Sequence, residues 1–198
     1  AALRRQQGDT RALDDLIRAG KIRYYGVSNM RGWRVADTVR LADRLGMPRP
    51  VVCQPHYNLL NRQAELELLP ACAHYGLGVV PYSPVARGVL TGKYPPGQAP
   101  AQDSRVGRGD RRILETEWRP ESLAIAQRLA VHAAARGVPM VRFAVAWVMA
   151  HRQVSSVIGG PRTLAQWQDY FDAETLGWTD AGEQAVDDLV MPGGSSSP

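Results

Sequence analysis

Hydrophobic residues along the chain fall into short apolar runs that alternate with segments of helical periodicity. Four short runs contain Val or Ile and are bounded by Gly, Pro, Ser or Asn, which is typical of strands buried on both faces. These runs cover residues 22–27, 51–54, 78–82 and 154–158. Each is followed by a segment whose apolar residues are three or four positions apart. The repeated order of strand and helix predicts an α/β fold with parallel strands and right-handed crossovers.

The helical segments carry recognisable start and stop signals. Pro120 is placed for the first turn of a helix, Gly46 follows the end of another, and Pro70 must kink or divide the helix that contains it. Asp180 and Glu183 have the spacing of a capping box. The expected helices cover residues 10–19, 32–45, 63–75, 120–136, 139–151, 164–171 and 180–190.

The length and composition predict one domain over residues 10–191. The chain has 198 residues, 44% of them hydrophobic, which is enough for one sizeable core. We predict no defined element for residues 1–9 and a flexible tail for residues 192–198. Residues 95–119 are dominated by Pro, Gly, Gln, Asp and Arg, so they predict a long surface loop, which is either a lid or binding loop or is disordered.

Charge and cysteine content narrow the functional classes. The net charge is +5, but the basic residues are scattered among 19 acidic ones, which favours a basic surface over a nucleic-acid site. Cys53 and Cys72 lie in apolar segments without metal-ligand spacing and predict reduced core residues, with no metal site. No apolar run approaches the roughly 20 residues of a membrane span, and no secretory signal is visible. We therefore expect a cytoplasmic protein with neither a nucleic-acid nor a membrane partner.

Polar residues follow the end of every predicted strand. In chain order they are Ser28, Asn29, Gln54, Tyr82, Ser83, Gly160 and Arg162. Because the carboxyl ends of parallel strands meet at one edge of a sheet, we expect these residues to lie together. The set contains groups that can bind an amide, an aromatic ring and a glycine–arginine segment. It predicts a pocket for a nucleotide that carries a carboxamide and phosphates.

Each of these features also has a simpler structural interpretation. Ser28 and Asn29 fit the N-cap of the next helix, which is the commoner role for such residues. Residues 159–163 form either a phosphate-binding turn or an ordinary turn with Thr163 as N-cap. Arg87 and Lys93 accompany two glycines in residues 86–94, which form either an anion-binding loop or a packing turn. His56 is a catalytic base in principle, but a lone histidine is more often structural.

Four segments together resemble the aldo-keto reductase family. They are RALDDLIRAGKIRYYGVSN at 11–29, QPHYNLL at 54–60, PYSPVARGVLTGKY at 81–94 and VIGGPRT at 157–163. The resemblance covers residues 10–190. It implies a TIM-type (β/α)₈ barrel that holds NADPH at the carboxyl ends of its strands, and it places this chain in the C-terminal half, strands five to eight.

The resemblance also implies roles for the residues at the nicotinamide and pyrophosphate. Ser28, Asn29 and Gln54 would hold the nicotinamide carboxamide. Tyr82 would stack on the nicotinamide ring. The residues that would line the pyrophosphate or its surroundings are Ser83, Pro84, Val85, Gly88 and Lys93.

At the adenosine, the resemblance implies that Arg162 and the backbone from Gly160 lie near the 2′-phosphate, which favours NADP over NAD. Gln166 and Asp169 would approach the adenosine. The sequence departs from the family pattern here, because Ala165, Trp167 and Tyr170 replace a usual acid, a smaller apolar residue and an asparagine.

The family's catalytic Asp, Tyr, Lys and His come from the first four strands, to which nothing in this chain corresponds, so we expect no catalytic residue here. The resemblance implies the cofactor-binding half of an NADPH-dependent oxidoreductase that reduces a small aldehyde or ketone to an alcohol. The alternatives are a non-catalytic nicotinamide-nucleotide binding or regulatory module, and an inactive truncated fragment. Four strands leave two open sheet edges, which predict self-association.

Overall fold

The computed structural model describes residues 2–95 and 97–197. Strands β1 (Gly26–Ser28), β2 (Val52–Gln54) and β3 (Gly78–Val79) form one parallel sheet in the order β1-β2-β3. In this sheet Gly26 lies opposite Val52, and Val52 lies opposite Gly78. The parallel pairing predicted for the first three strands is confirmed, although each strand is shorter than its apolar run.

The fourth predicted strand lies beside β3 but forms only two isolated parallel bridges. They pair Val79 with Val154 and Tyr82 with Ile158. Around these bridges Ser155 donates its backbone N–H to Val79 over 2.8 Å, and Ile158 donates to Pro81 over 2.9 Å. Pro81 has no N–H to return a bond, which interrupts the ladder between the bridges.

Most predicted helices form. Helix α2 has the predicted bounds and ends at Gly46, whose φ of 64° is left-handed. The helix predicted over residues 63–75 is divided in two, and Pro70 lies in the first turn of its second part, where a missing N–H costs nothing. The helices are α1 (Ala2–Arg18), α2 (Gly32–Leu45), α3 (Leu68–Tyr75), α4 (Arg111–Glu115), α5 (Pro120–Ala135), α6 (Met140–Ala150), α7 (Leu164–Glu174) and α8 (Asp180–Asp187), with 3₁₀ helices η1 (Gln63–Glu65) and η2 (Ala86–Thr91).

Two predictions about helix starts were wrong. The helix expected from residue 10 begins at Ala2, so residues 2–9 do belong to an element; Ala1 lies outside the described residues. Helix α8 is capped by Thr179, whose side chain accepts from the backbone of Gly182 over 3.2 Å, so Asp180 is not the cap. Glu183 is therefore free of a capping box and instead accepts a hydrogen bond of 2.9 Å from the indole of Trp178.

The C-terminal residues differ from the flexible tail that their composition predicts. Ser196 and Ser197 are buried. The backbone N–H of Ser196 donates to the carbonyl of Leu60 over 2.9 Å, and that of Arg62 donates to Gly194 over 2.8 Å. The described part of this segment thus packs on the turn that follows β2; Pro198 lies outside it.

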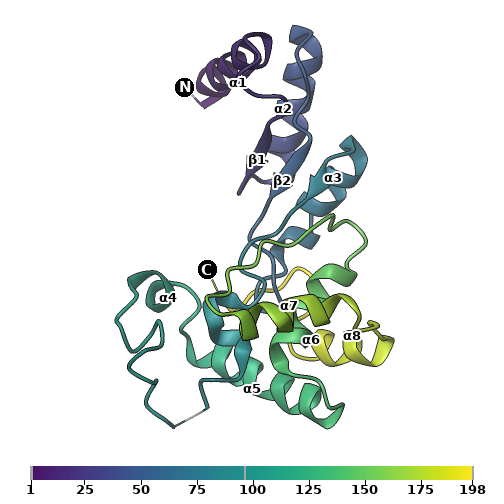
Figure 1. Cartoon of the computed structure of the whole chain (residues 1–198). Helices are drawn as coiled ribbons and strands as arrows, with labels where there is room; N and C mark the ends of the chain where they lie inside the picture. Colours follow the sequence, from purple (N-terminus) through teal and green to yellow (C-terminus); the bar gives the residue numbers. More distant parts are fainter. Residues whose placement is uncertain (1, 96, 198) are drawn as a thin grey trace.

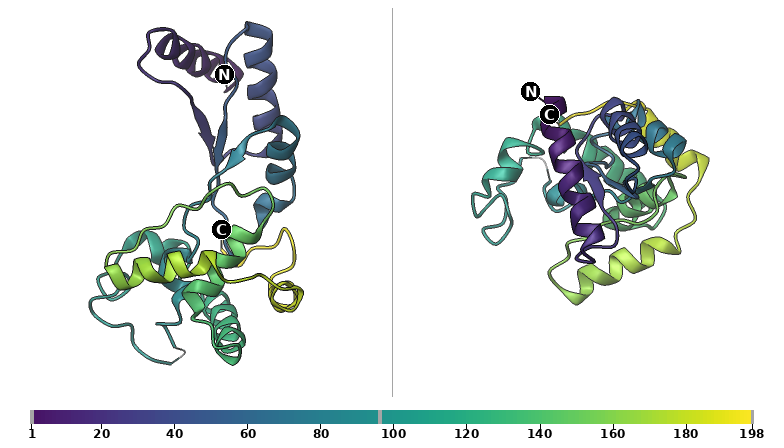
Figure 2. Two further views of the ribbon diagram at one scale, coloured as in Figure 1. Left: turned by 45° about the vertical axis from the view of Figure 1, so that its right-hand side comes forward. Right: turned by 90° about the horizontal axis from the view of Figure 1, so that it is seen from above.

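The elements divide between two ends of the molecule. Helices α1 and α2 with strands β1 and β2 form one end, α4 to α8 form the other, and α3 lies between them (Figure 1). The same division is visible after a turn of 45° (Figure 2). Within the described residues no single helix is long and apolar enough to cross a bilayer; only α5 and α6 taken together, bent by 96°, reach that length and composition.

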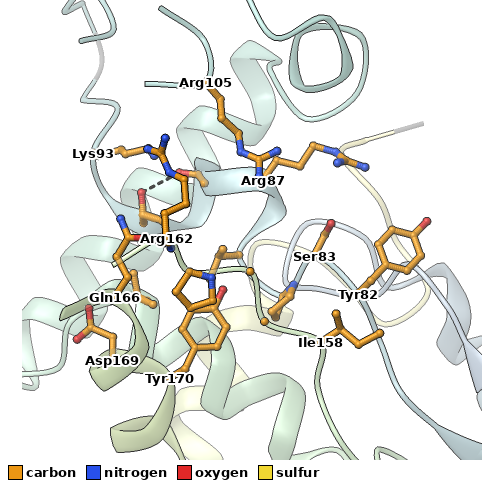
Figure 3. Close-up of a pocket in the computed structure, with 18 residues that line it drawn as sticks. Tyr82, Ser83, Arg87, Lys93, Arg105, Ile158, Arg162, Gln166, Asp169 and Tyr170 are labelled. Carbon is orange, nitrogen blue, oxygen red and sulfur yellow. Dashed lines mark hydrogen bonds between the residues drawn. The ribbon is translucent and has the colours of Figure 1, made fainter. Parts of the chain in front are cut away.

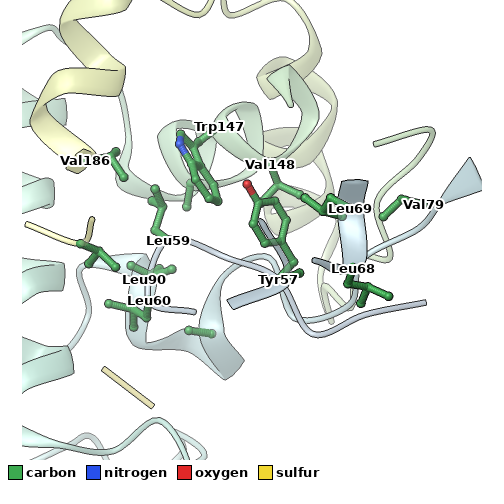
Figure 4. Packing of buried hydrophobic residues seen from close by; sticks show 14 of the residues in the cluster. Tyr57, Leu59, Leu60, Leu68, Leu69, Val79, Leu90, Trp147, Val148 and Val186 are labelled. Atoms are coloured by element: carbon green, nitrogen blue, oxygen red, sulfur yellow. The ribbon is translucent and has the colours of Figure 1, made fainter. Parts of the chain in front are cut away.

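The core is formed largely by the turn after β2 and by α6. The ring of Tyr57 lies 4.9 Å from that of Trp147, and Leu59 and Leu60 are fully buried in the same cluster (Figure 4). Cys53 and Cys72 are free thiols and fully buried in this core, as the sequence predicts. The turn that follows β2 is therefore anchored in the core by its buried side chains.

Candidate functional site

A pocket of about 410 Å³ opens where β3 and residues 154–158 end. This volume lies in the range of small-molecule sites. The lining comes from the end of β3, from η2 and the residues after it, from the loop before α4, and from the start of α7 (Figure 3). The pocket thus lies at the carboxyl ends of parallel strands, where α/β proteins bind ligands.

Ten of the predicted cofactor-binding residues line this pocket. They are Tyr82, Ser83, Pro84, Val85, Gly88, Lys93, Gly160, Arg162, Gln166 and Asp169. Ser28, Asn29 and Gln54 are not among its lining residues, but Tyr82 connects Asn29 to it. The hydroxyl of Tyr82 donates to Asn29 Oδ1 over 3.0 Å, and Ser28 Oγ donates to the carbonyl of Gln54 over 2.9 Å. The binding role of all these residues stays a prediction.

The capping interpretation of Ser28 and Asn29 is wrong. The N-cap of α2 is Arg31, which makes no side-chain capping bond. The first free N–H of the helix, that of Gly32, donates instead to Glu67 Oε1 over 3.0 Å. Ser28 and Asn29 are exposed at the end of β1, so their side chains do not serve the helix.

Backbone strain gathers at this edge of the sheet. Among the described residues, the non-glycine residues with positive φ are Asn29 at 52°, Ser83 at 58°, Ala86 at 47° and Arg87 at 54°. Residues other than glycine rarely adopt this region, and each such residue costs on the order of 1–3 kcal/mol. All four lie at strand ends or in η2. Strain of this kind concentrates at functional sites, where the surroundings hold an unfavourable conformation.

The cations lie mainly at one end of the pocket. Figure 3 shows Lys93, Arg105 and Arg162 together at that end and Tyr82 at the other. The ammonium of Lys93 lies over Gly88, where an added Cβ would be 3.1 Å from Nζ. Sequence analysis missed Arg105, because a single arginine in a loop rich in arginine carries no distinguishing signal. Arg87 lines the pocket too, but it pairs with the carboxylate of Glu117 over 3.1 Å.

The start of α7 is closed by its own side chains. Thr163 caps the helix and accepts from the backbone of Gln166 over 3.3 Å, as one interpretation of residues 159–163 predicts. The side chain of Gln166 in turn accepts from the backbone of Arg162 over 2.8 Å. Asp169 pairs with Arg142 over 3.1 Å. The capping turn and the pocket therefore coexist in one segment.

Two aromatic residues shape the pocket walls. His56 stacks on Tyr82, with ring centroids 5.2 Å apart and planes 20° apart, which covers one face of the tyrosine. The ring of Tyr170 packs against Gly159, where an added Cβ would lie 2.8 Å from two ring carbons. Burial raises the pKa of the Tyr170 hydroxyl above its ordinary value, so the group stays neutral.

An α/β chain with a pocket at the carboxyl ends of its parallel strands has the arrangement common to ligand-binding α/β folds. Comparison with known proteins is more specific, because the model of the Aldo/keto reductase family matches residues 9–190. The chain therefore belongs to the aldo-keto reductase family, as its motifs predict. This family has a TIM-type barrel fold, and the parallel sheet described above is consistent with it.

Similar proteins carry several names. A probable voltage-gated potassium channel subunit beta of Oryza sativa subsp. japonica is 35% identical over 151 residues, which are 76% of this chain and 46% of that protein. Versiconal hemiacetal acetate reductase of Aspergillus parasiticus is 32% identical over 150 residues, 75% of this chain and 43% of that protein. Aldo-keto reductase AMT2 of Alternaria alternata is 32% identical over 178 residues, 90% and 47% respectively. The chain spans about half the length of the curated relatives it matches.

Proposed function

We propose that the pocket binds NADP(H), and that the chain contributes this site to an oxidoreductase that reduces aldehydes or ketones to alcohols. The observation that carries the proposal is the pocket of about 410 Å³ with Lys93, Arg105 and Arg162 at one end and Tyr82 at the other. NADP(H) carries its phosphates on one side and a flat nicotinamide ring at the other end. This arrangement matches the cations at one end of the pocket and the aromatic ring at the other. Cytoplasmic NADP(H) pools would be the natural source of this ligand.

The residues present fit this cofactor. Arg162 is exposed at the pocket mouth and offers a planar guanidinium that suits the adenosine 2′-phosphate. Because His56 covers one face of Tyr82, the nicotinamide ring would stack on the other face. The exposed side chains of Asn29 and Gln54 would then orient its carboxamide. The bound cofactor supplies the hydride, whereas these residues bind and orient it.

Tyr25 and Tyr57 are not placed to donate a proton to a carbonyl substrate. Tyr25 donates its hydroxyl to the carbonyl of Pro48 over 2.9 Å, and Tyr57 donates to Glu65 over 2.7 Å. Burial first, and the charge of Glu65 second, raise the pKa of Tyr57 far above its ordinary value. Reduction therefore needs a proton donor other than Tyr25 and Tyr57. A nicotinamide-nucleotide binding module without turnover is the second candidate, favoured by this same observation.

Cofactor titration tests the proposal. Transfer of excitation energy from protein tryptophans to bound nicotinamide reports the dissociation constants of NADPH and NADH. We expect NADPH to bind more tightly by about 1.5–3 kcal/mol, the strength of a charge-assisted hydrogen bond. Arg162→Ala should remove that preference, while Arg128→Ala, at an exposed arginine of α5, should leave it unchanged.

Equal affinities for the two cofactors in the unmodified chain would contradict the role of Arg162, and no binding of either would end the proposal. Turnover of aldehydes and ketones with NADPH separates the two candidates. Tight binding without turnover supports the binding module. Turnover supports the reductase.

A further inference from the structure

One carboxylate anchors the loop that borders the pocket. Glu117 follows α4 in the 95–119 loop, and only 1% of it is exposed. Its Oε1 lies 3.4 Å from Nε2 of His56, just beyond β2, and its Oε2 lies 3.1 Å from Nε of Arg87, in η2. A single side chain thus joins the loop to the segments that follow β2 and β3.

The surroundings of Glu117 are built for a negative charge. A buried carboxylate is costly unless it is paired and hydrogen-bonded. Burial alone would raise the pKa of Glu117, but the contact with His56, the hydrogen bond from Thr116 and the charge of Arg87 outweigh burial and lower it. Glu117 is therefore ionised at neutral pH.

The same contacts define the orientation of His56. Its Nε2 lies 3.1 Å from the amide nitrogen of Asn58, whose two N–H groups can donate one hydrogen bond to this imidazole nitrogen and one to the carbonyl of Ser83, 3.0 Å away. The imidazole edge is therefore held between the amide of Asn58 and the carboxylate of Glu117.

Both partners of Glu117 act on the pocket. His56 stacks on the ring of Tyr82, and Arg87 is itself a lining residue. Arg105, a third lining residue, belongs to the same loop as Glu117. The carboxylate therefore lies behind the aromatic end of the pocket and holds the segment that supplies one of its cations.

We propose that Glu117 is a positioning residue of the pocket, which touches no ligand but fixes Tyr82 through His56, orients Arg87, and holds the loop that carries Arg105. The inference rests on the proposed nucleotide function. One consequence follows for the anion site: Arg87 is neutralised by the buried Glu117, whereas Arg105 makes only a long, solvent-exposed pair of 3.7 Å with Asp110, so Lys93, Arg105 and Arg162 are the cations that receive the phosphates.

The test compares Glu117→Gln, which keeps the shape and removes the charge, with Glu115→Gln at an exposed neighbour that pairs only with Arg111 among the described residues. NADPH affinity and the rate of tryptic cleavage within the loop are measured for both. We expect Glu117→Gln to weaken NADPH binding about 10- to 100-fold and to speed cleavage. Glu115→Gln should resemble the unmodified chain in both measurements.

A second variant separates positioning from general loss of stability. In Arg87→Met/Glu117→Gln both charges of the pair are gone, so no unpaired cation remains beside residue 117, and we expect part of the lost NADPH affinity to return. Unchanged affinity in Glu117→Gln, or a double variant weaker than the single one, would overturn the proposal. If the unmodified chain binds no NADPH, the proposed function fails, whereas the anchoring role of Glu117 is still judged by cleavage: an unchanged rate in Glu117→Gln refutes it.

Discussion

The side-chain amide of Asn58 donates a hydrogen bond of 3.0 Å to the carbonyl oxygen of Ser83. Asn58 is fully buried, and its own Oδ1 accepts from the backbone of Leu60 over 2.9 Å, which fixes the orientation of the amide. Ser83 is one of the residues with positive φ at the pocket. The rigid turn after β2 thus holds a strained residue at the point where the chain enters the pocket.

Replacing Asn58 by aspartate should disrupt this contact. Asn58→Asp places an oxygen acceptor against the Ser83 carbonyl while keeping the bond to Leu60. We expect the free energy of unfolding to fall by about 1–3 kcal/mol, the cost of an unsatisfied buried group, and NADPH binding to weaken. Urea denaturation and cofactor titration measure the two effects. An aspartate variant as stable as the unmodified chain would show that Ser83 keeps its conformation without Asn58.

Two adjacent glycines offer a matched pair. A Cβ on Gly159 would lie 2.8 Å from ring carbons of Tyr170, whereas a Cβ on Gly160 meets nothing within 4 Å. We expect Gly159→Ala to cost about 1–3 kcal/mol of unfolding free energy through overpacking, and Gly160→Ala to cost less than about 0.5 kcal/mol. Thermal unfolding without ligand compares them. Equal stability of the two variants would mean that the Tyr170 ring moves aside freely.

Acid should loosen the anchored loop. The pKa of Glu117 is lowered from the ordinary value of 4.5, so just below pH 4.5 the unfolded chain binds more protons than the folded one. The contribution of Glu117 to stability is therefore complete above pH 4.5 and is lost as the pH falls through the folded-state pKa. Urea unfolding measured from pH 7 to about pH 3 should show a steeper loss in the unmodified chain than in Glu117→Gln. Parallel profiles would contradict the ionised state of Glu117.

Residues close together in the sequence were sufficient to predict the helices that begin at a capping side chain or end at a left-handed glycine. Gly46 and Thr163 mark helix ends because the left-handed conformation and the capping oxygen act on their own turn. The parallel direction of the strands followed from the alternation of strand and helix. The strand lengths could not be predicted in this way. Pro81 interrupts the pairing with residues 154–158 because it lacks a backbone N–H, and that effect depends on a partner distant in the sequence.

Contacts between residues that are distant in the sequence could not be predicted from local sequence patterns. Glu117 lies in a polar loop, where a carboxylate has no periodic signal, and its burial depends on His56 and Arg87 from other elements. Ser196 follows a glycine-rich segment that is typical of a flexible tail, yet it packs on the carbonyl of Leu60. Asn58 and Glu117 would have been found only by asking which polar residues the fold buries.

The edges of the sheet predict self-association of this chain. In the described residues β1 is the outer strand on one side, and the segment 154–158 forms the other side. Unpaired strand edges pair readily with other chains, and a lysine at the edge opposes this. Tyr24, just before β1, is 72% exposed, and Trp33, on α2, is 58% exposed. We expect light scattering at micromolar concentration to show dimers or larger species, which Tyr24→Lys reduces and Trp33→Lys does not. A monomer in the unmodified chain would contradict the prediction, and an effect confined to Trp33→Lys would place the contact on α2 instead of the sheet edge.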